Sequence, residues 1–249
     1  KKMQMEAMTV RRAARMGTAT AVLFACVALA LALAPGTGAS PAGTSALGIV
    51  GSGTLEWPHV AVLAKPKAGA KRVRVLRQFR GNYQPQFVLA LSKLVDRKTG
   101  KTTWYRISLP GRPNGQTGWV RANAVRIKPV VKRLIIDRGA RRFQFWNGSR
   151  LVRTGKIAVG APGAETPTGL FYVQSKFVPN AAILGAFAFE TSAYSKLTDW
   201  PGGGVVGVHG TPWPELLGQA VSHGCVRLHN DDVQFLRTRI PLGMPVRII

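Results

Sequence analysis

The residues of this chain best suited to chemistry lie near its C-terminus, in the stretch AVSHGCVRLHND at 220–231. Cys225 is a potential nucleophile, and Gly224 before it permits a tight approach of the backbone. The amides around Gly224 and Cys225 could point at the oxyanion of a carbonyl under attack. A thiol also needs a base, and His209, followed by Gly210, ends an apolar segment able to pair beside Cys225. This pattern predicts nucleophilic catalysis by a cysteine.

Alternation along the segment CVRLH separates packing from chemistry, if the segment is a strand. Val226 and Leu228 then share one face and can be buried in a core. Cys225, Arg227 and His229 share the opposite face, toward a polar cleft. The thiol is therefore expected to face a site, while its neighbours anchor the strand.

Two other interpretations of these residues remain. A metal site would use His209, His223, Cys225 and His229, but their spacing matches no structural zinc pattern and no carboxylates complete a catalytic site. No metal or other cofactor is expected. The second interpretation is structural, with a buried cysteine and hydrogen-bonded histidines. It would account for any one of these residues alone, but it explains less well why Ser, His, Gly, Cys and Arg are adjacent.

The two motifs together resemble a known family. VHGT at 208–211 followed by SHGCVR at 222–227 is similar to the signature of the L,D-transpeptidase catalytic domain, also called the YkuD domain. ETPTGLFYV, LGQAVSHGCVRLHNDD and PLGMPVRII resemble other parts of that domain, so the likeness covers 133–249. Little of it extends to 175–204, which leaves substrate choice open.

The resemblance implies a reaction on peptidoglycan stem peptides. Cys225 would attack a peptide carbonyl of a stem tetrapeptide, release the terminal D-alanine and form a thioester. An amine of a second stem would resolve the thioester into a 3→3 cross-link, whereas water would make the protein an L,D-carboxypeptidase. His209 would be the base, and Gly210 would contact the substrate.

The remaining residues of the motif are given supporting roles by the same resemblance. The Ser222 hydroxyl would orient the catalytic histidine. His223 would shape the turn or act as an alternative base. Arg227 would hold a substrate carboxylate, or would pair instead with Asp231 or Asp232. His229 and His59 have no assigned role. Rival functions are a wall-peptide cysteine peptidase and a non-catalytic wall-binding protein.

The charge of the chain indicates an acidic partner. Lys and Arg number 35 against 10 Asp and Glu, for a net charge of +25. Without residues 1–17, which hold five basic side chains and one acidic one, the charge is still +21. Anionic cell-wall polymers are the expected partners, because no segment matches a nucleic-acid module and nucleic acid is not expected.

The first residues have the order of a secretory signal, a basic segment at 1–17 followed by an uncharged apolar run at 18–34. Seventeen residues rise about 25 Å as a helix, less than the bilayer core of roughly 30 Å. A cleaved signal is favoured, with an uncleaved membrane anchor as the alternative. The expected location is the cell envelope, outside the cytoplasm. The Gly- and Ser-rich residues 35–54 are expected to be a flexible tether, so 1–54 lie outside the folded domains.

The rest of the chain is predicted to be mainly β, with few short helices. An SH3-like β-barrel domain is expected at 55–128, because WYRISLPGRPNGQTGWVRANAV resembles bacterial SH3-like domains, and a β-rich YkuD-type catalytic domain at 129–249. The first domain would bind wall peptide or glycan, or act as a spacer. Its predicted strands are 60–64, 72–76, 86–95, 103–109 and 118–127.

In the second domain, strands are expected on both sides of the Asn147-Gly148 turn, at 165–174 and at 205–209. A covering loop is expected over 180–197. One helix is expected to begin with Asn230 as its N-cap and to stop at Pro241.

Overall fold

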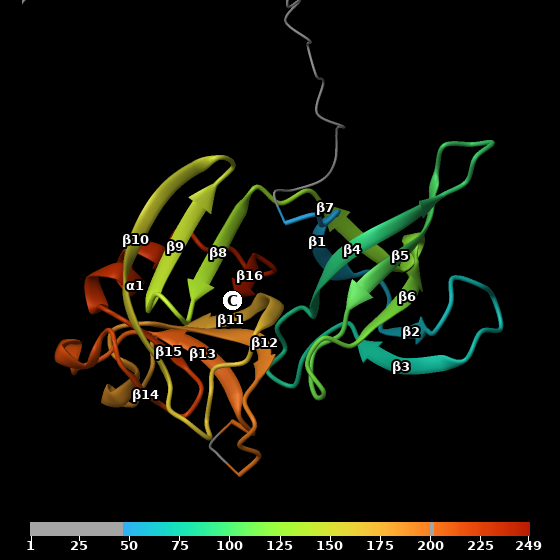
Figure 1. Ribbon diagram of the computed structural model, residues 1–249. Coiled ribbons are helices and arrows are strands. Elements are labelled where there is room, and N and C mark those ends of the chain that lie inside the picture. The colour runs from blue at the N-terminus through green and yellow to red at the C-terminus, as the bar shows by residue number, and fades with distance from the viewer. Residues whose placement is uncertain (1–46, 200–201) are drawn as a thin grey trace, which may run out of the picture. The chain divides into compact units, whose positions relative to one another are not determined.

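The computed structural model describes residues 47–199 and 202–249, which form two β-sheets (Figure 1). The predicted signal and most of the predicted tether lie outside the described residues. Within those residues no helix is long and apolar enough to cross a membrane. The chain is mainly β, as the sequence predicts, with one short α-helix.

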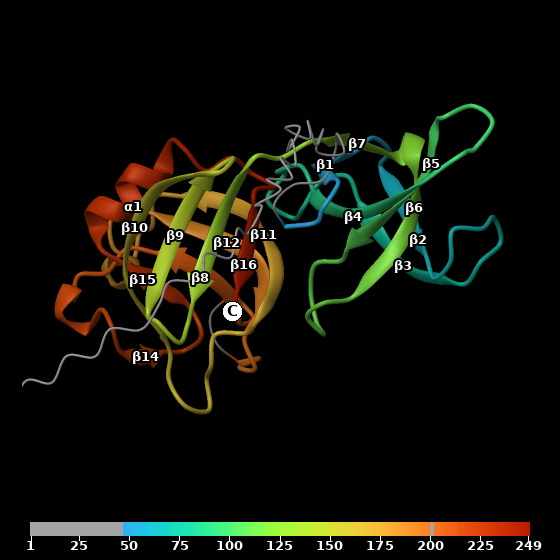
Figure 2. The same ribbon diagram turned by 45° about the horizontal axis from the view of Figure 1, so that its top comes forward.

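The N-terminal sheet has seven strands, and every pairing in it is antiparallel. In space the strands follow the order β3-β2-β6-β5-β4-β1-β7 (Figures 1 and 2). All five predicted strands are present, and the one predicted at 118–127 is divided by the 3₁₀ turn η1 (Ala122–Ala124). The strands are β1 (Gly51–Leu55), β2 (His59–Leu63), β3 (Arg72–Arg77), β4 (Phe87–Val95), β5 (Thr102–Ser108), β6 (Thr117–Arg121) and β7 (Val125–Lys128).

Strand β1 corrects the prediction of a tether that ends at residue 54. It lies between β4 and β7, and the backbone of β7 approaches two of its glycines too closely for any side chain to fit. A Cβ on Gly51 would lie 2.1 Å from the Lys128 carbonyl oxygen, and one on Gly53 would lie 1.7 Å from that of Arg126. The two glycines therefore allow close approach of β7, although their composition alone indicates a flexible segment.

The C-terminal sheet is mixed and closes on itself. Its strand order is β14-β10-β15-β13-β12-β11-β16-β8-β9, and β9 also pairs with β10, so eight strands form a barrel with β14 outside it. Figure 2 shows the strands around the barrel. They are β8 (Lys132–Asp137), β9 (Arg142–Asn147), β10 (Arg150–Gly160), β11 (Gly169–Phe177), β12 (Ala188–Tyr194), β13 (Val205–His209), β14 (Ala220–Ser222), β15 (Val226–Leu228) and β16 (Pro245–Ile248).

Each sheet has its own apolar core. The interior of the barrel is filled by side chains from alternating positions of its strands, and Val226 and Leu228 are completely buried in this core. Between the two sheets a third cluster joins Ile49, Leu89 and Tyr172, all buried. The sheets are therefore packed against one another as well as joined by the chain.

The helix α1 (Asn230–Arg237) differs at both ends from the prediction. Its N-cap is His229, whose Nδ1 accepts a hydrogen bond from the Asp231 amide, and not Asn230. Asn230 is already helical, and its side chain accepts from the Ala186 amide at 2.9 Å. The helix ends four residues before Pro241.

The predicted covering loop is largely wrong. Residues 188–194 form β12, which is one of the barrel strands and pairs with β11 and β13. Its Phe189 is only 1% exposed. Only a shorter part of the segment, the 3₁₀ turn η2 (Ala182–Leu184) with Gly185, packs over the residues that follow β13. A Cβ on Gly185 would lie 2.4 Å from the Gly210 carbonyl carbon, so this turn packs against the residue after His209.

Candidate active site

A parallel strand pair brings the predicted base and nucleophile together. Strands β13 and β15 pair with Val208 opposite Val226 and His209 opposite Arg227. Since side chains alternate, His209, Cys225 and Arg227 lie on the same side of this pair, and the two valines are buried on the other. The predicted burial of Val226 and Leu228 is confirmed, whereas His229 lies beyond the strand as the N-cap of α1 and does not share the face of Cys225 as predicted.

Gly207 marks the place where these side chains meet. Its amide donates a hydrogen bond to the Cys225 sulfur at 3.3 Å. A Cβ on Gly207 would lie 3.6 Å from His209 Cδ2 and 3.7 Å from Cys225 Sγ, so the ring edge and the sulfur flank the same point. The Cys225 thiol itself donates a long hydrogen bond to the Val205 carbonyl oxygen at 3.9 Å.

The imidazole of His209 is held by the backbone and is 3% exposed. Its Nδ1 lies 2.6 Å from the Gly210 carbonyl oxygen, which can only accept, so Nδ1 carries the proton and Nε2 the lone pair. Burial, and to a lesser degree the charge of Arg227, lower the pKa of His209 to about 4. The ring is therefore neutral at pH 7 and able to accept a proton.

The thiol of Cys225 is also neutral at rest. Burial raises its pKa, while the Gly207 amide and the Arg227 charge act in the opposite direction. A preformed thiolate–imidazolium pair is thus disfavoured on both sides. The arrangement suits a proton transfer that accompanies attack by sulfur, because the base and the thiol are both in their uncharged forms.

The turn before Cys225 is stabilised by Ser222. Its hydroxyl donates to the Cys225 carbonyl oxygen at 2.6 Å and accepts from the Gly224 amide at 3.2 Å. The expected role of Ser222 in orienting His209 is thus taken by the Gly210 carbonyl. Because the Gly224 amide is already engaged, only the Cys225 amide of the expected pair is left to consider for an oxyanion.

Arg227 is buried beside the site, with 9% of its surface exposed. Its Nε has no hydrogen-bond partner among the described residues, and its guanidinium lies 5.9 Å from the Trp213 ring centroid. The predicted alternative, an ion pair with an aspartate of the helix, is not present: Asp232 pairs with Arg153 at 2.6 Å. Arg227 therefore keeps its charge available on the face that carries Cys225.

The other histidines are spread around the fold. His223 is exposed on the turn, His229 caps α1, and His59 is exposed on β2. Within 47–199 and 202–249 no group of three or more His, Cys, Asp or Glu side chains is placed to hold a metal ion.

Two residues at the site were missed by sequence reasoning. Gly207 could have been found, because it precedes His209 by two positions on a strand and so shares its face. Asn230 could not, because its contact with the turn before β12 depends on the tertiary fold. A Cβ on Gly210 would lie 2.2 Å from Asn230 Oδ1, so this asparagine also restricts the residue that orients the imidazole.

Comparison with known proteins identifies the C-terminal region. The model of the L,D-transpeptidase catalytic domain, YkuD, matches residues 131–248. A Bacillus subtilis protein named as the L,D-transpeptidase YkuD is 30% identical over 151 residues, 61% of this chain and 79% of that protein. L,D-transpeptidase 1 of Mycobacterium tuberculosis is 26% identical over 204 residues, 68% of this chain and 80% of that protein.

Among solved structures, L,D-transpeptidase 3 of Mycobacterium tuberculosis superposes with a TM-score of 0.44 at 15% identity. The superposition covers 66% of this chain and 91% of that one.

Proposed function

This chain belongs to the L,D-transpeptidase family with a YkuD catalytic domain, and from that membership we propose that it is a cysteine-dependent L,D-transpeptidase making 3→3 peptidoglycan cross-links. The family acts on peptidoglycan peptides at the cell envelope. The parallel pair of β13 and β15 carries the proposal, because it sets the imidazole ring of His209 and the sulfur of Cys225 around one point beside Gly207.

In the first half-reaction, Cys225 Sγ attacks the carbonyl carbon of the peptide bond before the terminal D-alanine. The thiol proton passes to Nε2 of His209 as the carbon–sulfur bond forms. The same proton is then given to the leaving amine, the carbon–nitrogen bond breaks, and a thioester and free D-alanine result. The Cys225 amide and the positive charge of Arg227 stabilise the transient oxyanion.

In the second half-reaction, an amine of a second stem peptide attacks the thioester. His209 takes the proton of this amine and returns it to the departing sulfur, so the enzyme is regenerated and an amide cross-link is made. Water in place of the amine would give a carboxypeptidase. A net charge of +25 supports binding to anionic wall polymers, and the N-terminal sheet is proposed to be an SH3-like wall-binding domain.

The test is to incubate the folded protein with a disaccharide-tetrapeptide of peptidoglycan and to analyse the products by mass spectrometry. We expect release of D-alanine, a covalent acyl adduct on Cys225 and a dimer linked 3→3. Cys225→Ala should lose all three. Absence of both D-alanine release and the adduct in the folded wild type would refute the proposal, and tripeptide without dimer would assign the carboxypeptidase reaction.

The resemblance also implies that a carbapenem acylates Cys225, which gives a probe independent of the peptide. Intact mass should increase by one inhibitor on the wild type and remain unchanged on Cys225→Ala. An adduct that survives in the variant would place the reactive group elsewhere.

A further inference from the structure

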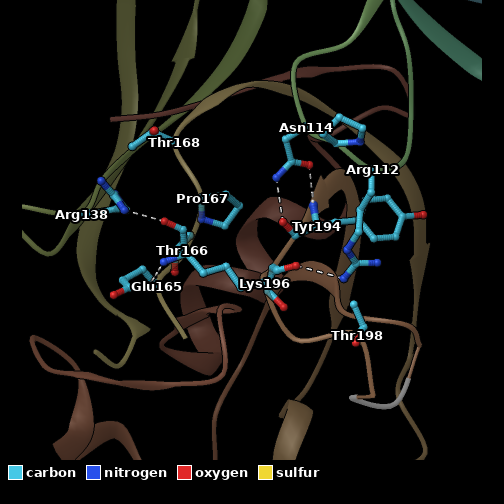
Figure 3. Close-up of a pocket in the computed structure, with 12 residues that line it drawn as sticks. Arg112, Asn114, Arg138, Glu165, Thr166, Pro167, Thr168, Tyr194, Lys196 and Thr198 are labelled. Carbon is cyan, nitrogen blue, oxygen red and sulfur yellow. Dashed lines mark hydrogen bonds and ion pairs between the residues drawn. The ribbon is translucent and has the colours of Figure 1, made fainter. Parts of the chain in front are cut away.

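A pocket of about 790 Å³ adjoins the turn that carries Cys225. It has a volume suited to a small ligand or a short peptide segment. Three segments distant in sequence line it: 112–114 from the N-terminal sheet, 165–168 after β10, and 194–198 after β12 (Figure 3). Arg138, at the end of β8, completes the lining.

The pocket wall is in direct contact with the residue before the nucleophile. Gly224 has φ +113°, and a Cβ there would lie 2.7 Å from Ser195 Cβ and 3.6 Å from the Ala164 carbonyl oxygen. Ser195 lines the pocket, and Ala164 directly precedes the second lining segment. The wall of the pocket therefore contacts the turn that carries Cys225, although Cys225 itself does not line the pocket.

The N-terminal sheet builds one side of this pocket. Arg112 donates hydrogen bonds to the carbonyl oxygens of Ser195 and Leu197 at 3.0 and 2.9 Å, and stacks on the Tyr194 ring at 4.8 Å. Asn114 donates to the Tyr194 carbonyl at 2.7 Å and accepts from its amide at 3.0 Å, as Figure 3 shows. These contacts hold the segment after β12 in place.

The lining carries an excess of positive charge. Lys196 is paired with Glu165 at 3.0 Å, whose pKa falls to about 2 because it accepts backbone amides and faces this ammonium. Arg112 and Arg138 have no carboxylate partner within the described residues. Arg138 donates to the Thr166 carbonyl at 2.6 Å, and its buried Nε has no hydrogen-bond partner. A guanidinium in this state can bind a carboxylate with charge-assisted hydrogen bonds.

We propose that this pocket is a subsite for a carboxylate of the wall peptide, with Arg138 as its main anchor and Lys196 as a secondary one. The inference rests on the proposed function for the identity of the peptide, and on the cavity and its charges for the site. The subsite is composite, because Arg112 and Asn114 of the N-terminal sheet keep its wall in place.

The test compares two peptides on the wild type and three variants. The probes are the disaccharide-tetrapeptide and the same molecule with its free carboxylates converted to amides. We expect the wild type to favour the acidic form in KM by about tenfold, the order of one charge-assisted hydrogen bond. Arg138→Gln should lose most of this preference, and Lys196→Glu, at an exposed position, should lose it without affecting the fold. Arg150→Gln, exposed at the start of β10 opposite Asn147 and absent from the pocket lining, is the control and should keep it.

Binding measured by calorimetry on Cys225→Ala separates this inference from the reaction. If no D-alanine is released but the acidic peptide still binds better than the amide, the proposed function fails and the subsite remains. If D-alanine is released but the two peptides bind equally, or if both pocket variants keep the preference while folded, the subsite is wrong.

Discussion

The two sheets of this protein differ in how they pair their strands, and the difference explains where the chemistry lies. In the N-terminal sheet all pairings are antiparallel. In the C-terminal sheet, three pairings are parallel: β10 with β14, β13 with β15, and β16 with β8. A parallel pair needs a long connection, and it brings the same face of two distant segments together. His209 and Cys225 meet across such a pair, with the turn of Ser222 inside the connection.

The same comparison locates the contribution of the N-terminal sheet. Its own strands carry no group placed like Cys225 and His209, yet its hairpin loop 110–116 reaches the segment that touches Gly224. The C-terminal sheet supplies the reactive groups, and the N-terminal sheet holds in place the segment that packs against Gly224. Matched substitutions in the two sheets test this division.

Replacement of the base should have the largest effect. His209→Asn is expected to reduce the rate of D-alanine release by about 10²- to 10⁴-fold, because the thiol loses its proton acceptor. The exposed His59→Asn in the N-terminal sheet should leave the rate unchanged. Rates from a D-alanine assay on both folded variants decide the matter, and equal losses would remove the distinction between the sheets.

Acid should destabilise the barrel through the same histidine. His209 has a folded pKa of about 4 against 6.5 for the free side chain, so the unfolded state takes up a proton first as the pH falls. Stability is fully present above pH 6.5 and decreases as the pH falls from 6.5 to about 4, by roughly 3 kcal/mol. Denaturant unfolding at several pH values should show this slope in the wild type and a shallower one in His209→Asn.

The turn before the nucleophile should tolerate no side chain. Gly224→Ala adds a Cβ that clashes with Ser195 at 2.7 Å in a left-handed conformation, and we expect about 2 kcal/mol of destabilisation and a tenfold or greater loss of rate. Gly100→Ala, at φ +67° in the hairpin turn between β4 and β5, has open space around its Cβ. It should lose about 1 kcal/mol and no activity, as measured by thermal unfolding and D-alanine release.

The smallest of these effects is expected at the contact between the sheets. Arg112→Gln should lower kcat for D-alanine release by about fivefold, because the segment at 194–197 loses its hydrogen bonds and shifts against Gly224. Arg112→Lys should recover part of the loss. Arg106→Gln, whose guanidinium contacts Thr117 within the N-terminal sheet, is the control and should have the wild-type kcat. A change in stability alone, with kcat intact, would contradict a positioning role.

Sequence reasoning was accurate where local pattern decides structure. Alternation around Val226 identified the buried face, and the Asn147-Gly148 turn was placed correctly between β9 and β10. It failed where a residue acts through tertiary contact. Gly51 and Gly53 look like linker residues but permit close strand packing, and Ser222 bonds its own turn while the Gly210 carbonyl holds the imidazole. Such partners are set by the fold, and composition does not reveal them.

The close approach of Gly51 to Lys128 has a consequence for the modularity of the chain. β1 begins where β7 ends, so the polypeptide enters and leaves the N-terminal sheet at one corner. A module whose ends meet can be removed or exchanged by joining the flanking residues, without a spacer to bridge a gap. A replacement module would have to provide the apolar side chains that pack on Tyr172 and a loop equivalent to the one that carries Arg112.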